Sequence, residues 1–505
     1  MLEKSQAEPT TVAAGAALPR PWAGRAHLAA AALRRHWLAA VLLAAGLVLR
    51  VLAQVAYRPA LFYIDTTRYL YNDAPGMDPV GYKGPLRAIL AVANFNAVAA
   101  VQHLLGLAMA VVLYVLLLRR GCPRWLAALA MAPLLLDAYQ IQIEQTLMPD
   151  TWFEALVVAG LAILLWRPAP GWRMAAAGGL VLGTSAIFAQ VGEALLLPAV
   201  IYLLAVGGGW RRALGRAATV CVAFVLPILA YSAVNYLAAG NFFLSHTGVT
   251  SVYGRMAAAA DCATLRLPQA ERGMCPTRTQ QAKGPDSLEY DQDSPIRPYY
   301  NGLERDRVDS LIADFNHRVL TQQPLRVLHA YLRDVVRPFA LTRDGSPGVT
   351  AISRWQFQTS YPYFPPHASR QVIHSSVDRY GGGRPTVWGP GATFLRGYQL
   401  HGGYTPGPLF ALCVLAGLLG SASLLLCLPR PRAPRPLGGR AGRAVREPAL
   451  ACLLMFTSGA AVLLVSDVFE FSWRYLLPAL VTLVPAGALG IAVVIGAVRA
   501  RRTAG

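Results

Sequence analysis

The sequence predicts an all-α protein that crosses a membrane many times. Of its 505 residues, 55% are hydrophobic and only 14% are charged, and the mean hydropathy is +0.40. Soluble domains carry a charged share of roughly 25%. Long apolar runs occupy both ends of the chain, and a run of about twenty residues suffices to cross roughly 30 Å of hydrocarbon.

About ten such runs are present, of which the third and fifth are the least regular. The polar first thirty residues contain no cleavage pattern after a short apolar core, so the first run is expected to be a retained anchor. The expected spans are 37–57, 88–118, 125–140, 149–166, 173–189, 192–208, 215–237, 407–428, 449–466 and 475–498.

Arginines flank alternate loops, which sets the expected orientation. Lys and Arg accumulate on the cytoplasmic side of membrane proteins. Basic clusters lie at 34–35, 119–124, 167–173, 211–216, 430–446 and 499–502. Both termini are therefore expected in the cytoplasm. The segments expected on the outer face are 58–87, 141–150, the turn around Glu193, 238–406 and 467–474.

The net charge of +20 follows from these loops. No basic stretch is interleaved with base-stacking aromatic residues, so nucleic acid is not expected as a partner. The richness in Ala, Arg, Gly and Pro is typical of a bacterium with a GC-rich genome, which would place the chain in a bacterial plasma membrane.

The expected organisation has five parts. They are a disordered cytoplasmic segment 1–36, a membrane core 37–237 with its first outer loop at 58–87, an extracytoplasmic segment 238–406, C-terminal spans 407–498 with an extended cytoplasmic linker 429–447, and a cytoplasmic tail 499–505.

Segment 238–406 is expected to mix loops and short helices. Apolar residues recur at helical spacing in 303–320 and 325–336, whereas the remainder is rich in Gly, Pro and aromatic residues. Cys262 and Cys275 stand alone in a polar stretch, where a disulfide would form if the segment lies outside the cytoplasm. The other five cysteines lie in or beside apolar runs and are expected to be small core residues.

Segment 57–87 has the densest charge outside the basic loops. Asp65 follows the first span among aromatic residues and could accept a proton from a hydroxyl group. Equally, Asp65 could cap a short interfacial helix, as an N-cap residue does. Asp73 and Asp78 add two further carboxylates to this loop.

The stretch 78–86 predicts a tight turn with Tyr82 and Lys83 at its tip. Lys83 and Arg87 could bind a phosphate, or they could anchor the chain beside lipid headgroups.

An acidic residue shortly after the first span, followed by the Pro79-Val80-Gly81-Tyr82 turn, resembles the integral-membrane glycosyltransferases of the GT-C fold. A last span beginning Arg474-Tyr475, with Pro478, strengthens the resemblance. The family commonly continues Gly-Tyr-Pro, where this chain has Lys83. The resemblance implies a mannosyl- or arabinosyltransferase-like enzyme that takes its sugar from a polyprenyl phosphate.

The resemblance also implies site residues. Asp65 would be the catalytic base, and the family's second acidic residue would be Glu144, Asp150 or Glu154. The reaction would invert the anomeric carbon and deliver the sugar to an envelope glycan, lipid or protein. Cations or hydroxyl groups that could hold the donor are Tyr82, Lys83, Arg255, Arg474 and Tyr475.

Two of these assignments have alternatives. Arg474 could instead pair with Asp467 or Glu470. Glu144 and Asp150, with Asp65 or Asp73, could hold a divalent cation, although no ligand spacing specifies one and no other cofactor is implied.

Two other functions fit the same composition. A transporter or flippase for lipid-linked glycans would depend on polar residues within the membrane, such as Arg50 and His103. A non-catalytic relative would keep the fold and serve as an assembly partner.

Overall fold

The computed structural model describes Ala31 and residues 33–71, 79–240, 242–245, 248–426 and 440–502. Over these residues the protein is mainly helical, with almost no strand. The one sheet in the described ranges has two short strands, β1 (Tyr57–Arg58) and β2 (Thr386–Val387), paired antiparallel with Tyr57 opposite Val387.

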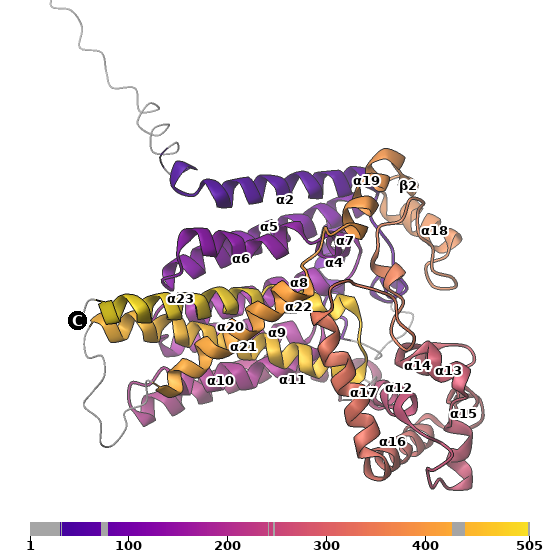
Figure 1. Cartoon of the computed structure of the whole chain (residues 1–505). Helices are drawn as coiled ribbons and strands as arrows, with labels where there is room; N and C mark the ends of the chain where they lie inside the picture. The colour runs from indigo at the N-terminus through magenta and orange to yellow at the C-terminus, as the bar shows by residue number, and fades with distance from the viewer. Residues whose placement is uncertain are drawn as a thin grey trace, which may run out of the picture.

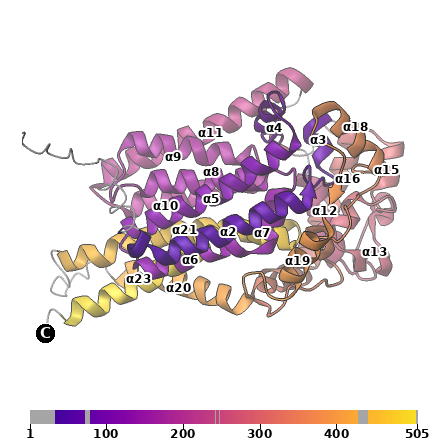
Figure 2. The same ribbon diagram turned by 90° about the horizontal axis from the view of Figure 1, so that it is seen from above.

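Within the described chain, six stretches are helical, long and apolar enough to cross a membrane. They run side by side in Figures 1 and 2. The helices that supply them are α2 (Trp37–Ala56), α5 (Phe95–Arg119), α11 (Trp210–Ala239), α20 (Gly407–Leu426), α21 (Arg440–Phe469) and, with η5 (Trp473–Leu476) and α22 (Leu477–Leu480), α23 (Leu483–Arg502).

Shorter helices fill the other expected spans. They are α6 (Arg124–Leu136), α7 (Ala138–Gln145), α8 (Asp150–Leu165), α9 (Trp172–Ala186), η1 (Gln190–Leu195) and α10 (Leu196–Ala205). Taken together, α6 and α7 pass the same test of length and apolarity, but they are bent by 51°.

The bend between α6 and α7 has a local cause. Asp137 ends α6 and caps α7, because its Oδ1 accepts the backbone N–H of Tyr139 at 3.0 Å. Its Oδ2 pairs with Arg343 Nη2 at 2.7 Å and accepts the Thr405 N–H at 2.8 Å. Every residue of α7 is buried, so this polar helix points into the bundle.

Three expected boundaries differ from the structure. The run 88–118 does not form one helix, because Asn94 caps α5 by accepting the Asn96 N–H and so separates α5 from α4 (Lys83–Leu90). The helix α21 already begins at Arg440, within the linker expected at 429–447. Likewise α23 continues to Arg502, within the expected tail.

Segment 248–406 gathers at one end of the bundle (Figure 1). Its first part has its own core, which includes Tyr253, Leu288, Ile312 and Phe315. The elements of this part are α12 (Gly248–Ala259), η2 (Gln269–Met274), α13 (Arg278–Lys283), α14 (Pro285–Tyr290), α15 (Arg297–Gly302), α16 (Arg305–Gln322), α17 (Pro324–Val336) and η3 (Arg337–Phe339). The two amphipathic patterns of the sequence form α16 and α17.

The second part of the segment packs on the end of α2. It contains η4 (Ile352–Trp355), α18 (Arg370–Tyr380), β2 and α19 (Gly389–Leu400). Tyr57 stacks on Phe357 with ring centroids 5.2 Å apart. The C-terminus lies at the other end of the bundle from segment 248–406 (Figure 1).

Candidate active site

Backbone hydrogen bonds attach the loop that carries Asp65 to the end of α7 and to the residues that follow it. The Leu61 N–H donates to Gln145 O, and the Leu147 N–H donates back to Leu61 O, both at 2.9 Å. Beyond Asp65, the Thr66 hydroxyl donates to Leu147 O at 3.2 Å. Residues 61–66 are therefore held at both ends against residues 145–147.

Asp65 directly precedes α3 (Thr66–Tyr71), which is the position of an N-cap residue. Its carboxylate oxygens contact two arginines: Oδ1 lies 3.3 Å from Arg68 Nη2, and Oδ2 lies 4.0 Å from Arg474 Nη1. The side chain of Asp65 is 21% exposed. The carboxylate thus lies at the end of the bundle, accessible to solvent and beside positive charge.

Arg474 joins this loop to α8. Its Nε lies 2.8 Å from Oδ1 of Asp150, the first residue of α8. Its guanidinium group also stacks over Trp355, 5.1 Å from the ring centroid. Arg474 therefore pairs with Asp150 and Asp65 and not with Asp467 or Glu470, the two partners considered as alternatives.

A second arginine reaches the same region from η4, in segment 238–406. Arg354 Nη1 donates to Asp286 Oδ2 at 2.9 Å and to the Tyr63 hydroxyl at 3.3 Å. Tyr63 in turn packs on Trp355, with ring centroids 4.6 Å apart. Burial raises the pKa of the Asp286 carboxyl, although the Arg354 charge opposes the shift.

Glu470 adds another carboxyl group directly after the C-terminal end of α21. Its Oε1 accepts from the Tyr475 hydroxyl at 3.0 Å, and its Oε2 accepts from the Thr350 hydroxyl at 3.1 Å. Burial, together with the nearby charge of Asp286, raises the pKa of Glu470 to about 7. Glu470 can therefore exchange a proton near neutral pH.

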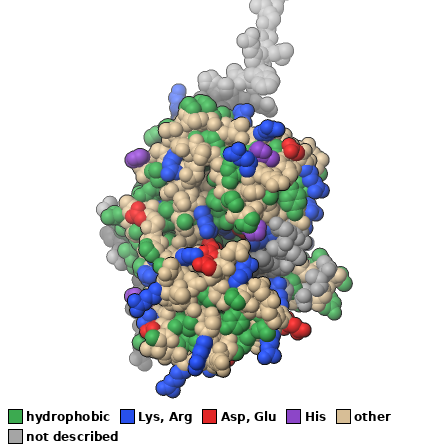
Figure 3. Space-filling model, turned by 90° about the vertical axis from the view of Figure 1, so that its right-hand side faces the viewer, with side chains coloured by type: hydrophobic (Ala, Val, Ile, Leu, Met, Phe, Trp, Pro, Cys, Tyr) green, Lys and Arg blue, Asp and Glu red, His purple; other side chains and the backbone are tan. Residues whose placement is uncertain are grey.

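These residues form what we call the outer cluster. It brings together acidic and basic side chains from five parts of the chain. Near the centre of the face in Figure 3, acidic side chains lie directly beside basic ones. The outer cluster consists of Asp65, Arg68, Asp150, Asp286, Arg354, Glu470 and Arg474.

Sequence reasoning identified Asp65, Asp150 and Arg474 in the cluster but missed Arg354 and Asp286. Both come from parts of segment 238–406 outside 303–320 and 325–336, where no periodic pattern indicates which residues face the bundle. The dipeptide Arg354-Trp355 is the one local signal, because a cation beside an aromatic residue is typical of a binding surface.

The Gly81-Tyr82 turn serves the packing of the bundle. A Cβ on Gly81 would lie 2.3 Å from the carbonyl oxygen of Ile187, so only glycine fits. Tyr82 is fully buried and donates its hydroxyl proton to Gln102 Oε1 at 2.8 Å. Lys83 is half-buried at the start of α4, and burial together with the Arg87 charge lowers its pKa.

Arg255 lies outside the outer cluster. Its Nη1 pairs with Asp334 Oδ2 at 2.6 Å, and its Nη2 donates to the Asp467 carbonyl oxygen at 2.9 Å. With only 2% of its surface exposed, Arg255 joins α12, α17 and α21.

Glu144 belongs to a separate set of charges inside the bundle, which we call the buried network: Arg50, His103, Glu144 and Gln145. Glu144 accepts from Arg50 at 2.7 and 2.8 Å and contacts His103 Nδ1 at 3.0 Å. His103 Nε2 contacts Gln145 Oε1 at 2.7 Å. A Cβ on Gly106 would lie 2.2 Å from Glu144, so this carboxylate occupies space that only a glycine leaves free.

A cation site built from Glu144 with the outer carboxylates is not assembled. Within the described ranges, no group of three His, Cys, Asp or Glu side chains is placed to hold a metal ion. Asp73 and Asp78 lie outside the described residues.

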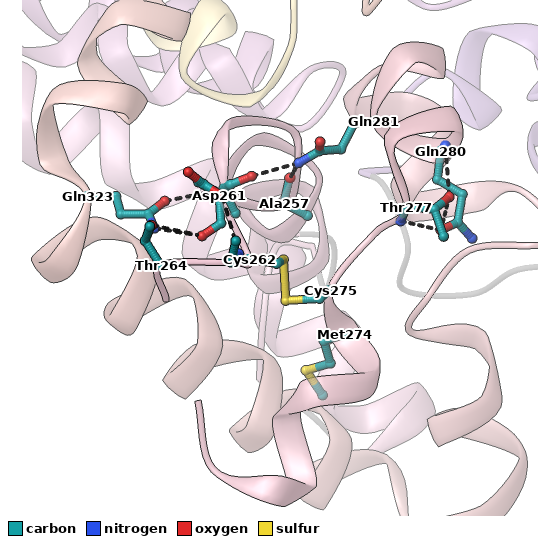
Figure 4. The surroundings of a disulfide bond; sticks show 12 residues. Ala257, Asp261, Cys262, Thr264, Met274, Cys275, Thr277, Gln280, Gln281 and Gln323 are labelled. Carbon is teal, nitrogen blue, oxygen red and sulfur yellow. Dashed lines mark hydrogen bonds between the residues drawn. A yellow bond between two sulfur atoms is a disulfide. The ribbon is translucent and has the colours of Figure 1, made fainter. Parts of the chain in front are cut away.

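Cys262 and Cys275 are joined in a disulfide, which ties the end of α12 to the end of η2 (Figure 4). Beside it, Gln323 accepts the Asp261 N–H at 2.8 Å. A cavity of about 610 Å³ adjoins the disulfide and is lined in part by Arg266, Arg272 and Arg318. None of its lining residues belongs to the outer cluster.

Comparison of the chain with protein-family models, with curated proteins and with solved structures gives no match.

Proposed function

We propose that the protein is a membrane glycosyltransferase that moves a sugar from a polyprenyl-phosphate donor to an envelope glycan, lipid or protein. The observation that carries the proposal is the position of Arg474, between the carboxylates of Asp65 and Asp150 at the end of the membrane bundle. A base and an anion-binding cation lie side by side where a lipid-borne substrate would arrive.

Asp65 is the base in this proposal. Its carboxylate takes the proton of the acceptor hydroxyl while the acceptor oxygen forms a bond to the anomeric carbon. The bond between that carbon and the phosphate oxygen breaks, its electron pair leaves with the polyprenyl phosphate, and the anomeric configuration inverts. A single carboxylate suffices, because the leaving group is already an anion.

Arg474 stabilises the charge that grows on the departing phosphate. Its contact with Asp65 spans 4.0 Å, against 2.8 Å for its contact with Asp150. A donor phosphate would therefore displace the weaker partner, Asp65, and leave Asp150 to orient the guanidinium group. Arginine suits this role because its planar fork matches phosphate oxygens.

The proposal includes a membrane topology with ten crossings. The six long helices, the bent pair α6–α7, and the shorter α8, α9 and η1–α10 make ten crossings of a bacterial plasma membrane. Both termini then lie in the cytoplasm and the outer cluster lies on the outer face, where envelope acceptors are found.

Transport of a lipid-linked glycan is a second candidate, and the buried network favours it. Ionisable residues within a membrane bundle commonly mark a path for ions or substrates. In this chain Arg50, His103 and Glu144 occupy such positions. A non-catalytic assembly partner is the third candidate.

The test compares the full chain with Asp65→Asn in nanodiscs, using radiolabelled polyprenyl-phosphate sugars and an envelope extract. We expect Asp65→Asn to lower transfer by about 10²- to 10⁴-fold, the range for loss of a general base. The matched control is Asp378→Asn, which removes an exposed carboxylate on α18 and should leave transfer unchanged.

Any of three outcomes would count against the proposal. Full activity in Asp65→Asn would remove Asp65 from the mechanism. Movement of the lipid-linked sugar across the bilayer by the wild type, with no glycosidic bond formed from any donor, would favour transport. Donor binding with neither event would favour the assembly partner.

A further inference from the structure

The helix α17 carries an apolar stripe that the described part of the chain leaves uncovered. Leu325, Leu328, Leu332 and Val336 are 77%, 48%, 49% and 57% exposed. Their spacing of three and four residues places them on one face of the helix. Four large apolar side chains in a row on a water-facing helix would be costly, since each exposes surface that burial would stabilise.

The opposite face of α17 is fixed to the protein. Val327 and Asp334 are buried there, and Asp334 pairs with Arg255 at 2.6 Å. Because Arg255 also bonds to the backbone of Asp467 on α21, the orientation of α17 is set by the membrane bundle. Because these contacts hold the opposite face of α17, the apolar stripe points away from the protein.

The contacts with α21 also set the depth of α17. The Tyr331 hydroxyl donates to the carbonyl oxygen of Leu464 at 3.2 Å. Leu464 lies five residues before the end of the span Val445–Phe469, which is about 7 Å along the helix axis. At this level a spanning helix passes through the boundary between hydrocarbon and headgroups.

The direction of α17 agrees with that depth. In Figure 1 α17 runs steeply across the bundle, whereas α20, α21 and α23 run along it. A helix in this orientation lies in the plane of the membrane surface.

The stripe also continues onto the lipid-facing surface of the bundle. Beyond α17, Phe339 stacks on Phe410 of α20 with ring centroids 5.8 Å apart. Next to this contact, Leu341, Leu409 and Leu412 are 76%, 50% and 63% exposed. Exposed apolar side chains are thus found on α17, just beyond it, and on α20, one of the helices long and apolar enough to cross a membrane.

We infer that α17 is an interfacial helix whose apolar stripe is embedded in the outer leaflet of the bilayer. Its exposed arginines, Arg326 and Arg333, would lie at the level of the headgroups, as basic residues on such helices do. Contact with the lipid surface then helps to hold segment 248–406 in place on the membrane. This inference stands whether or not the outer cluster transfers a sugar.

Spin labels on the full chain test the inference. Single cysteines at Leu328 and Leu332 report on the stripe, and cysteines at Arg326 and Arg333 serve as matched controls on the same helix. The background has Cys122, Cys221, Cys413, Cys427 and Cys452 replaced by alanine and keeps the disulfide. Collisions with oxygen and with a water-soluble nickel chelate are measured in nanodiscs of phosphatidylcholine and phosphatidylglycerol.

We expect the ratio of oxygen to nickel accessibility to be several-fold higher at Leu328→Cys and Leu332→Cys than at the two control positions. Equal nickel access at all four positions would place the stripe in water and overturn the inference. Exclusion of both reagents from the stripe would overturn it too, because that result indicates a covering protein or a second copy of the chain.

Discussion

The buried network and the outer cluster use the same residue types in opposite ways. In the buried network, all five N–H donors of Arg50 are bonded, to Glu144 and to the carbonyl oxygens of Gly46, Leu134 and Leu135. In the outer cluster, Arg474 has one close carboxylate at 2.8 Å and one at 4.0 Å, and 18% of its side chain is exposed.

The difference teaches which charges are free to act on a substrate. A charge taken out of water is tolerated when every donor and acceptor is matched, so a complete set of bonds is the signature of a structural role. A charged group next to solvent whose hydrogen-bonding positions are not all occupied can still bind a ligand. By this criterion Arg50 holds α2, α6 and α7 together, and Arg474 is available to an anion.

The largest expected effect comes from breaking the complete set of hydrogen bonds around Arg50. Arg50→Met leaves Glu144 buried without its main partner, so the free energy of unfolding should fall by about 3 to 5 kcal/mol. Thermal unfolding of the purified chain in detergent measures this loss.

The matched control removes both charges of the pair. Arg50→Met combined with Glu144→Gln should recover much of the stability, because no unpaired charge then remains buried. If the single variant is as stable as the wild type, the buried network does not hold the helices together, and the transport hypothesis gains weight.

A smaller effect, on activity alone, is expected from Arg474→Lys. Lysine keeps the charge but loses the planar fork that spans Asp150 and a phosphate, so transfer should fall by about 10- to 100-fold with little change in stability. The control is Arg266→Lys on the exposed surface of the outer segment. Unaltered transfer in Arg474→Lys would show that a point charge suffices and that the guanidinium geometry is irrelevant.

The smallest effect is a pH dependence in the outer segment. Burial raises the pKa of Glu289 to about 7, although Thr250 and Ser251 donate to its Oε1. Between the ordinary carboxyl pKa and pH 7, the folded state binds more protons than the unfolded state. The stability that protonated Glu289 contributes is therefore lost as the pH rises through this window.

Glu289→Gln should abolish that loss. At pH 8 the variant should be more stable than the wild type by on the order of 2 kcal/mol, and at pH 5 the two should be similar. Unfolding midpoints at both pH values measure the difference, with Asp306→Asn on the exposed surface of α16 as control. The same decline in wild type and Glu289→Gln would assign the pH dependence to another group.

The sequence predicted the individual members of the outer cluster where they lie at the ends of apolar runs. Asp65, Asp150 and Arg474 are charged residues next to spans, and the regular alternation of basic loops assigned them to one side of the membrane. Their contacts could not be predicted, because the distance between two span ends depends on how the helices pack. The pairing of Arg474 with Asp150 is a product of that packing.

The sequence predicted some helix boundaries and site residues less well. Most of α7, including Glu144, was expected in the outer loop 141–150, whereas Asp137 breaks the helix and turns Glu144 into the bundle. The runs at 149–166 and 173–189 give helices of 16 and 15 residues, because the residues at their ends form turns and caps. Asp286 and Arg354 lie in helices of only six and four residues, which are too short to show an apolar period in the sequence.

The double attachment of residues 61–66 to residues 145–147 has a consequence for loop length. A single inserted residue displaces an extended chain by about 3.3 Å, whereas Asp65 and Arg474 are already 4.0 Å apart. Since both ends of the segment are bonded, an extra or missing residue could be absorbed only by moving Asp65. In chains that share this architecture, an insertion or deletion between 61 and 66 would therefore separate the carboxylate from Arg474.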